Sequence, residues 1–218
     1  MSAILHVQVK TAYEAESAEL GGADRLVLVG SDPQLSPEID VVAKVRRATS
    51  LDLRLRLRTR AGYTVDGAEM TRLKGLAFSF LCAGADGFVF GFLNTICGID
   101  RLAFCELAGD ATWGWTFDRA VDAALDQTQA WEDLESLPRL DAVMTAGSAR
   151  QVGHGLDRLI TLAATRPPVI AAGGLLPEHI PWLTRAGLRQ FYLDQSPITP
   201  EAVRAWRRLL DEEAASQR

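Results

Sequence analysis

Strand-like and helix-like segments alternate along the whole 218-residue chain, and this order is typical of βα units around a parallel sheet. The predicted strands are Ile4–Val9, Arg25–Gly30, Leu53–Arg58, Gly87–Phe92, Trp113–Phe117, Ala142–Gly147, Val169–Gly173 and Gln190–Asp194. The predicted helices are Ala12–Leu20, Ser36–Ala48, Asp66–Ala83, Asp100–Ala108, Asp126–Leu137, Leu156–Thr165, Pro177–Ala186 and Thr199–Ala215. Most of these helices end at a Gly or just before a Pro, as helix termini require.

These βα units favour a closed barrel over an open sheet. A (β/α)₈ barrel usually needs about 250 residues and can be built with about 200. An open doubly wound sheet usually has about five or six units, which would leave some of the segments unexplained. No linker, low-complexity run or change of composition marks a domain boundary. We therefore predict an α/β protein with one (β/α)₈ TIM-barrel domain over residues 1–218.

Charge and cysteine content limit the classes of partner. With 28 acidic and 23 basic side chains, the formal net charge is −5, which argues against nucleic acid and anionic membranes as partners. The N-terminus lacks a signal-peptide pattern, and three cysteines imply no disulfide framework, so we expect a cytoplasmic protein. The three histidines and three cysteines show no metal-site spacing. We predict neither a metal site nor a cofactor from the residues.

Alternation within the strands predicts a polar barrel interior. In the third strand Leu alternates with Arg54, Arg56, Arg58 and Arg60. The fifth strand sets Thr116 and Asp118 opposite Trp115 and Phe117, and the eighth places Tyr192 with Gln190 and Asp194. In an antiparallel sheet the polar side of such strands would face solvent. In a barrel one side faces the interior, so we expect inward arginines with aspartate partners.

The carboxyl ends of barrel strands are where barrel enzymes place their sites. The loops after the sixth and seventh strands, Thr145–Ser148 and Ala171–Gly174, are small and glycine-rich, which lets backbone N–H groups approach an anion. We predict a pocket for a small phosphate or carboxylate ligand, with arginines contacting it. The predicted ligand-binding residues are Lys10, Arg58, Arg60, Asp118, Thr145, Ser148, Gly173, Gly174 and Asp194. The alternative is that the glycines only form tight turns and the arginines only pair with aspartates.

No pattern identifies a catalytic residue. Asp118 among arginines would stay ionised and be a poor acid. Lys10 near other cations is a candidate nucleophilic amine, and Cys97 is a candidate thiol, but no motif supports either. Whether the protein is an enzyme is therefore left open.

Four segments stand out as a set: Ala23-Asp24-Arg25, Arg58-Thr59-Arg60-Ala61-Gly62, Gly84-Ala85-Asp86-Gly87-Phe88-Val89-Phe90-Gly91 and Thr116-Phe117-Asp118-Arg119-Ala120-Val121-Asp122. They resemble segments of the CutC copper homeostasis family. Their order and spacing are similar to those of the family from about residue 4 to residue 194, including the late pair Gly173-Gly174. The resemblance implies a (β/α)₈ barrel and a role in copper homeostasis.

The chain departs from the family pattern where copper ligands would be sought. The family's Glu and Cys of the second strand fall at Val27 and Val29, and those of its opening strand fall at His6 and Gln8. The family's histidines fall at Asp118 and near Tyr192. Copper(I) prefers thiolate, thioether and imidazole ligands, and most of these are missing at the matching positions. Copper as a cofactor therefore follows from the family resemblance alone.

We expect a CutC-like protein with a pocket for a small anionic ligand and without a family-type copper site. Two alternatives remain: a lyase, isomerase or hydrolase acting on a phosphorylated or carboxylated metabolite, and a non-catalytic binding protein. Exposed Trp or Phe on the helices would indicate a homodimer.

Overall fold

The computed structural model, which describes residues 3–164 and 167–216, is a closed barrel of parallel strands in the order β1 to β8. The strands are β1 Ile4–Val9, β2 Arg25–Leu28, β3 Asp52–Arg56, β4 Gly87–Phe90, β5 Gly114–Phe117, β6 Leu140–Thr145, β7 Val169–Ala171 and β8 Gln190–Leu193. β8 pairs with β1 in register Ile4 to Gln190, which closes the ring. The predicted (β/α)₈ TIM barrel is confirmed.

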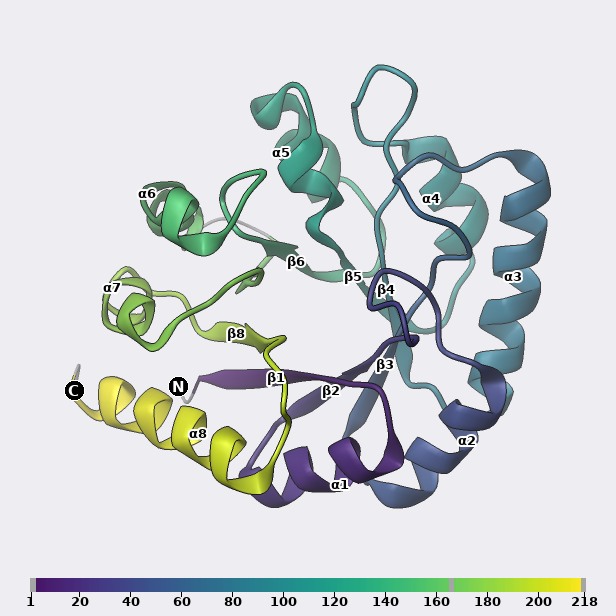
Figure 1. Ribbon diagram of the computed structural model, residues 1–218. Helices are drawn as coiled ribbons and strands as arrows, with labels where there is room; N and C mark the ends of the chain where they lie inside the picture. The colour runs from purple at the N-terminus through teal and green to yellow at the C-terminus, as the bar shows by residue number, and fades with distance from the viewer. Residues whose placement is uncertain (1–2, 165–166, 217–218) are drawn as a thin grey trace.

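Helices surround the barrel and cover its outer side (Figure 1). They are α1 Ala12–Gly21, α2 Ile39–Ala48, α3 Gly67–Cys82, α4 Arg101–Ala108, α5 Gln127–Glu135, α6 Val152–Leu162, α7 Ile180–Arg185 and α8 Pro200–Ala215, with 3₁₀ turns η1 Arg119–Ala123 and η2 Pro177–His179. Side chains of Thr11, Asp66, Asp100, Asp126 and Thr199 accept N–H groups of the first turn that follows each. Within the described residues, none of the helices has the length and apolar character needed to cross a membrane.

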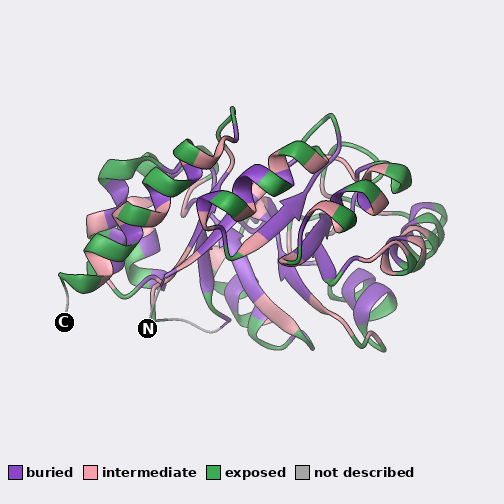
Figure 2. Cartoon of the chain, turned by 90° about the horizontal axis from the view of Figure 1, so that it is seen from below, coloured by how far each residue is buried: buried purple, intermediate pink, exposed green. Residues whose placement is uncertain are grey.

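The main hydrophobic core lies between the strands and the helices, where the buried residues of both meet (Figure 2). Its densest part is aromatic: the Trp115 ring lies 4.7 Å from Phe90 and 4.9 Å from Phe104, nearly parallel to both. Trp115 and Phe117 therefore point outward from β5, as their alternation predicts, and leave Thr116 and Asp118 on the inner side.

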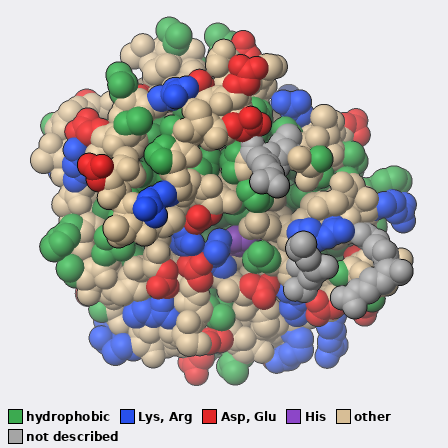
Figure 3. Space-filling view, turned by 180° about the vertical axis from the view of Figure 1, so that it is seen from behind, with side chains coloured by type: hydrophobic (Ala, Val, Ile, Leu, Met, Phe, Trp, Pro, Cys, Tyr) green, Lys and Arg blue, Asp and Glu red, His purple; other side chains and the backbone are tan. Residues whose placement is uncertain are grey.

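Charged side chains fill the amino-terminal end of the barrel. Arg54 donates to Asp52 at 2.8 Å and to Asp141 at 2.7 Å, and Arg25 pairs with Asp52 at 2.8 Å. Acidic and basic side chains gather at the centre of this face (Figure 3). This network confirms the predicted polar interior with arginine–aspartate pairs. Above it, apolar inner side chains from β2, β4, β6 and β7 form a second, smaller core: Val27, Val29, Val89, Ala142, Met144, Ile170 and Ala172, with Tyr192 of β8.

Ser36 does not cap a helix, contrary to the prediction that Ser36 begins one. Helix α2 begins at Ile39, and Ser36 instead contacts the end of β3. The Ser36 hydroxyl accepts the Arg58 backbone N–H at 2.8 Å, and the Ser36 N–H donates to the Arg58 carbonyl at 2.9 Å. These two hydrogen bonds join Ser36 to the chain just after β3 and hold Arg58 in place. Ser36 makes this tertiary contact instead of capping a helix.

Helix α6 begins at Val152, four residues before the predicted start at Leu156. The pair Gly153 and Gly155 suggested a loop, but both are helical. A Cβ on Gly155 would lie 2.0 Å from the Ala146 carbonyl oxygen, so glycine lets α6 approach the loop after β6. The predicted end of this helix, Thr165, lies outside the described residues.

Candidate functional site

A cavity of about 380 Å³ opens at the carboxyl ends of the strands, where barrel enzymes carry their sites. Three of the predicted ligand-binding residues line it: Arg58, Asp118 and Asp194. The other lining residues are Gln8, Pro33, Gln34, Arg56, Gly62, Tyr63, Arg119, Met144, Ala172 and Tyr192. The cavity thus has three guanidinium groups and two carboxylates on a largely polar wall.

Asp118 connects two arginines of β3 at the base of this cavity. One carboxylate oxygen, Oδ2, accepts from Arg56 Nη1 at 2.8 Å and from Arg58 Nη2 at 2.6 Å. The other oxygen accepts the Ala120 backbone N–H at 2.9 Å. Burial alone would raise the pKa of the Asp118 carboxyl, but Arg58 and Arg56 together hold it below its usual value. Asp118 is therefore a permanent anion that orients two cations.

Arg58 is held by more partners than a ligand-binding arginine needs. Besides Asp118, its guanidinium donates to the Gly91 carbonyl at 2.9 Å and to the Gly62 carbonyl. The Tyr63 ring lies 5.0 Å from its Cζ atom, and only 4 % of its side chain is exposed. Arg58 thus fixes the loop after β3 and leaves ligand contact to its neighbours.

Arg56 has spare hydrogen-bonding capacity. It lines the cavity and donates one N–H to Asp118, while its buried Nε atom has no hydrogen-bond partner among the described residues. Arg56 therefore keeps donor capacity beyond its bond to Asp118. Arg56 belongs to the same Leu/Arg alternation as Arg58, and that pattern was the signal for an inward Arg56 that our site prediction did not use.

Arg119 contributes the third cation from the first residue of η1. Its Nε donates to Asp122 at 2.9 Å, and its Nη2 donates to the carbonyls of Arg150 at 2.8 Å and Ser148 at 3.4 Å. A Cβ on Gly173 would lie 2.3 Å from Arg119 Nη1, so a glycine is needed where the guanidinium crosses the loop after β7. Arg119 was not among the predicted ligand-binding residues, because its position depends on contacts with Ser148 and Arg150, far away along the chain.

The polar groups of the loop after β6, which was predicted to help seat an anion, make hydrogen bonds within the protein. The Thr145 hydroxyl and the Ala146 N–H both donate to Asp122, and the Gly147 N–H donates to Thr145. The Ser148 carbonyl faces Arg119, and the Ser148 hydroxyl donates to the Gln151 carbonyl. The loop after β6 therefore positions Arg119 through Asp122 and the Ser148 carbonyl.

Several predicted site residues consequently lie outside the cavity: Lys10, Arg60, Thr145, Ser148, Gly173 and Gly174. The Lys10 ammonium donates to the Ser31 carbonyl at 3.2 Å. Arg60 was predicted to point inward, and this is wrong: its side chain is 49 % exposed and pairs with Asp66 and Glu69 near the start of α3. β3 ends at Arg56, so the strand alternation no longer applies at Arg60.

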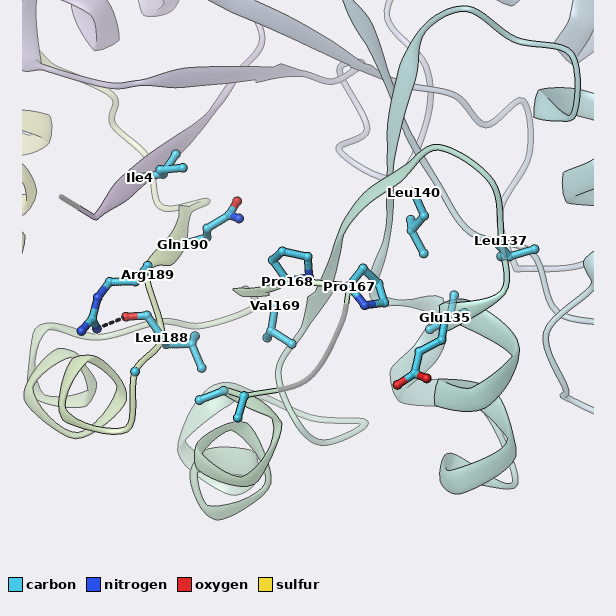
Figure 4. A pocket seen from close by; sticks show the side chains of 14 residues that line it. Ile4, Glu135, Leu137, Leu140, Pro167, Pro168, Val169, Leu188, Arg189 and Gln190 are labelled. Atoms are coloured by element: carbon cyan, nitrogen blue, oxygen red, sulfur yellow. Dashed lines mark hydrogen bonds between the residues drawn. The ribbon is translucent and has the colours of Figure 1, made fainter. Parts of the chain in front are cut away.

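A larger hollow lies at the opposite, amino-terminal end of the barrel. It measures about 1040 Å³ and is lined mainly by apolar residues, including Leu137, Leu140, Pro168 and Val169 (Figure 4). The Arg189 guanidinium beside it donates to the Leu188 carbonyl at 2.8 Å. Ligand sites have convergent polar groups, and the smaller cavity brings three guanidinium groups and two carboxylates together. We therefore place the candidate site at the carboxyl end.

Comparison with known proteins identifies the family. The sequence profile of the CutC family matches residues 3–196. The chain belongs to the CutC family. It is 29% identical to the CutC family protein of Xanthomonas axonopodis pv. citri over 196 residues, covering 86% of this chain and 81% of that protein. It is 30% identical to the human copper homeostasis protein cutC homolog over 184 residues, covering 81% and 67%.

Solved structures confirm the fold of this CutC-family chain. The putative copper homeostasis protein CutC from Streptococcus agalactiae superposes with a TM-score of 0.79 at 16% identity, covering 88% of this chain and 99% of that one. Thiamine phosphate pyrophosphorylase from Pyrococcus furiosus superposes with a TM-score of 0.65 at 13% identity, covering 97% and 96%. At these identities the likeness establishes the barrel architecture alone.

The side chains of this CutC-family chain do not fit a copper(I) ion at the cavity. Copper(I) prefers soft thiolate, thioether and imidazole ligands, and of these types only the Met144 thioether lines the cavity. Cys82, Cys97 and Cys105 are exposed free thiols on or beside the outer helices. Across residues 3–164 and 167–216, no group of three or more His, Cys, Asp or Glu side chains is arranged to hold a metal ion.

Proposed function

We propose that this CutC-family protein binds a small organic or inorganic anion in the cavity at the carboxyl end of the barrel. The observation that supports this most directly is the pair Arg56 and Arg119, which line the cavity from β3 and from the η1 turn after β5. Both are held from behind by buried aspartates, Asp118 and Asp122. Guanidinium groups fixed in this way favour phosphate and carboxylate oxygens, because little side-chain freedom is lost on binding.

The size of the cavity limits the ligand to a small metabolite or anion. A volume of about 380 Å³ lies at the lower end of the range for ligand pockets, which is roughly 300 to 1,000 Å³. Gln8 and Gln34 add amide groups to the wall, and Tyr63 adds a phenol. Burial raises the pKa of the Tyr63 hydroxyl, so this group stays neutral at physiological pH. Phosphorylated or carboxylated metabolites of a few carbon atoms suit these dimensions.

Sulfate is a suitable first probe for this proposal, with chloride at matched ionic strength as the reference. At ten times the Kd, binding stabilises the folded state by about 1.4 kcal/mol, which raises Tm by about 3–5 °C for a chain of this length. Arg56→Gln should lose this increase, while the exposed control Arg47→Gln should keep it. Equal responses of wild type and Arg56→Gln to sulfate would contradict an anion site at Arg56.

We also propose that the protein lacks a copper site of the family type. The support is the ligand chemistry: the cavity offers arginines and aspartates, and the exposed thiols lie on separate elements. Copper(I) titration of the reduced protein against a competing chelator tests this. Binding that is lost in a Cys82→Ser, Cys97→Ser, Cys105→Ser variant agrees with adventitious thiol binding. Tighter binding that survives in that variant would contradict the proposal.

An enzymatic role on such a metabolite remains the alternative, favoured by the unpaired carboxylate of Asp194 at the cavity wall.

We propose a cytoplasmic location, since free exposed thiols suit a reducing compartment. A homodimer also stays a prediction. Phe78 on α3 and Trp182 on α7 are 70% and 56% exposed, but they lie on opposite sides of the barrel and form no single patch (Figure 1).

A further inference from the structure

Asp194 differs from the other aspartates of the cavity because no arginine holds it. Asp118 pairs with Arg56 and Arg58, and Asp122 pairs with Arg119. Asp194 stands directly after β8, lines the same cavity, and forms no ion pair with any described residue. Its carboxylate lies beside the backbone N–H groups of Gly174 and of Asp194 itself. Asp194 is thus a carboxylate in an arginine-lined cavity that forms no ion pair with any of the described arginines.

The charge balance of the cavity depends on this one group. Three arginines, Arg56, Arg58 and Arg119, carry three positive charges, and Asp118 and Asp122 neutralise two of them. An ionised Asp194 cancels the third and leaves the cavity without net charge. A protonated Asp194 leaves one positive charge, which an incoming anion would neutralise.

Burial raises the pKa of the Asp194 carboxyl above its usual value, against the opposing effects of the two backbone N–H groups and Arg119. The other titratable or charged groups of the cavity are Arg56 and Arg58 from β3, Tyr63 from the loop after β3, Asp118 after β5, and Tyr192 of β8. Burial raises the pKa of both tyrosines, which therefore stay neutral. On β1, Gln8 lines the cavity, while the Lys10 ammonium bonds to Ser31.

Asp122 is the other group that could take up a proton, because burial also raises the pKa of its carboxyl. Its oxygens, however, accept from Arg119, from the Thr145 hydroxyl and from the Ala146 N–H. Protonation of Asp122 would weaken all three hydrogen bonds and free Arg119 from its position. Protonation of Asp194 would affect only its contacts with the backbone N–H groups of Gly174 and of Asp194 itself.

We propose that anion binding in this cavity is linked to protonation of Asp194: an anion binds together with one proton, which converts the Asp194 carboxylate into a neutral carboxyl group. This inference rests on the proposed anion site and adds the regulation of that site. The proton comes from solvent and offsets one negative charge of the incoming anion. Anion affinity therefore falls as pH rises and Asp194 ionises, by up to about tenfold per pH unit.

Calorimetric titration with sulfate tests the proposal, because the charge of sulfate is constant between about pH 5 and 8. Repeating the titration in buffers with different ionisation enthalpies gives the number of protons taken up by the wild-type protein. We expect proton uptake on binding, which is largest at the pH where Asp194 is ionised in the free protein and protonated in the complex. Asp194→Asn should abolish this uptake and flatten the pH dependence of Kd, and Asp110→Asn, which removes one exposed charge elsewhere, should leave both unchanged.

The outcomes separate this inference from the proposed function. Sulfate binding without proton uptake in the wild type would overturn the role of Asp194 and leave the anion site standing. Uptake that persists in Asp194→Asn would also overturn it and point to Asp122. Absence of sulfate binding in the wild type and in both variants would refute the anion site itself.

Discussion

Asp118 is the residue on which the upper barrel interior depends, because it alone compensates two buried guanidinium groups. Arg58 and Asp118 are 4 % and 2 % exposed, so each would be costly without the other. Removing one partner of a buried ion pair typically destabilises a protein by about 3–5 kcal/mol, since the remaining charge loses its compensation.

Asp118→Asn should therefore lower the free energy of unfolding by about 3 kcal/mol in urea titrations. The matched control is Asp40→Asn, which breaks an exposed pair with Lys44 on the surface of α2 and should leave the stability close to that of wild type. A stability of Asp118→Asn equal to that of the control would show that the two arginines do not need this carboxylate.

His6 makes the stability depend on pH. Its ring is fully buried, its Nε2 lies 3.0 Å from Gln190 Oε1, and its Nδ1 has no hydrogen-bond partner among the described residues. Burial, and secondly the charge of Arg25, lowers the pKa of His6 to about 3. The unfolded chain takes up this proton near pH 6.5 and the folded chain near pH 3. The contribution of His6 to stability is thus complete above pH 6.5 and is lost as pH falls toward 3.

Comparing wild type with His6→Gln, which keeps a donor for Gln190, isolates this effect from the titration of the carboxylates. Between pH 6.5 and 4 the wild type should lose more free energy of unfolding than the variant. The limit is about 5 kcal/mol over the full range down to pH 3. Parallel pH profiles of the two proteins would contradict a neutral, buried His6.

At the scale of elements, β4 and β5 leave space for the charged side chains of their neighbours. Gly91 follows β4, and a Cβ there would lie 2.3 Å from Asp118 Oδ1. Gly87 and Gly114 likewise leave space for Arg54 and Asp141 nearer the amino-terminal end of the barrel. Small residues on two adjacent strands thus accommodate arginine and aspartate side chains that reach across the interior.

Gly91→Ala should displace the Asp118 carboxylate, weaken its bonds to Arg56 and Arg58, and destabilise the fold by about 2 kcal/mol. Gly75→Ala is the control: it lies on exposed α3 with nothing within 4 Å of its Cβ, and it should stabilise the fold by about 0.5–1 kcal/mol. Urea titration of both variants checks the prediction. A neutral Gly91→Ala would mean that the Asp118 cluster can move aside freely.

The alternation within the strands correctly predicted which side chains face the interior, because it depends only on neighbouring residues in the sequence. The Leu/Arg alternation of β3 correctly placed Arg54, Arg56 and Arg58 inside, and that of β5 placed Asp118 inside. The same alternation gave a wrong prediction for Arg60, because arginine continues to alternate in the sequence after β3 has ended. Where a strand ends depends on partners such as Ser36, which lies far away along the sequence.

The loops after β6 and β7 could not be predicted for a similar reason. Their glycines have the composition of an anion-binding turn, and only the folded structure shows Arg119 and Asp122 occupying their polar groups. The glycines at 87, 91 and 114 were a usable signal, because inward glycines on adjacent strands mark space for large inner side chains. That signal would have directed attention to Arg56 and Asp118 together.

At the scale of the whole molecule, charged side chains occupy both ends of the barrel interior, with apolar residues between them. The arginine–aspartate pairs at the amino-terminal end satisfy one another, whereas the carboxyl end contains a cavity lined by Arg56 and Asp194. Among the described residues, Arg56 Nε has no hydrogen-bond partner and Asp194 forms no ion pair. This asymmetry agrees with the general rule that barrels separate stability from binding between their two ends.

The most direct test of the anion site is a crystal structure of the protein soaked in selenate, measured at the selenium edge. The account predicts an anomalous peak inside the cavity, within hydrogen-bond distance of Arg56 or Arg119. Peaks confined to the outer surface, with none inside the barrel mouth, would contradict it.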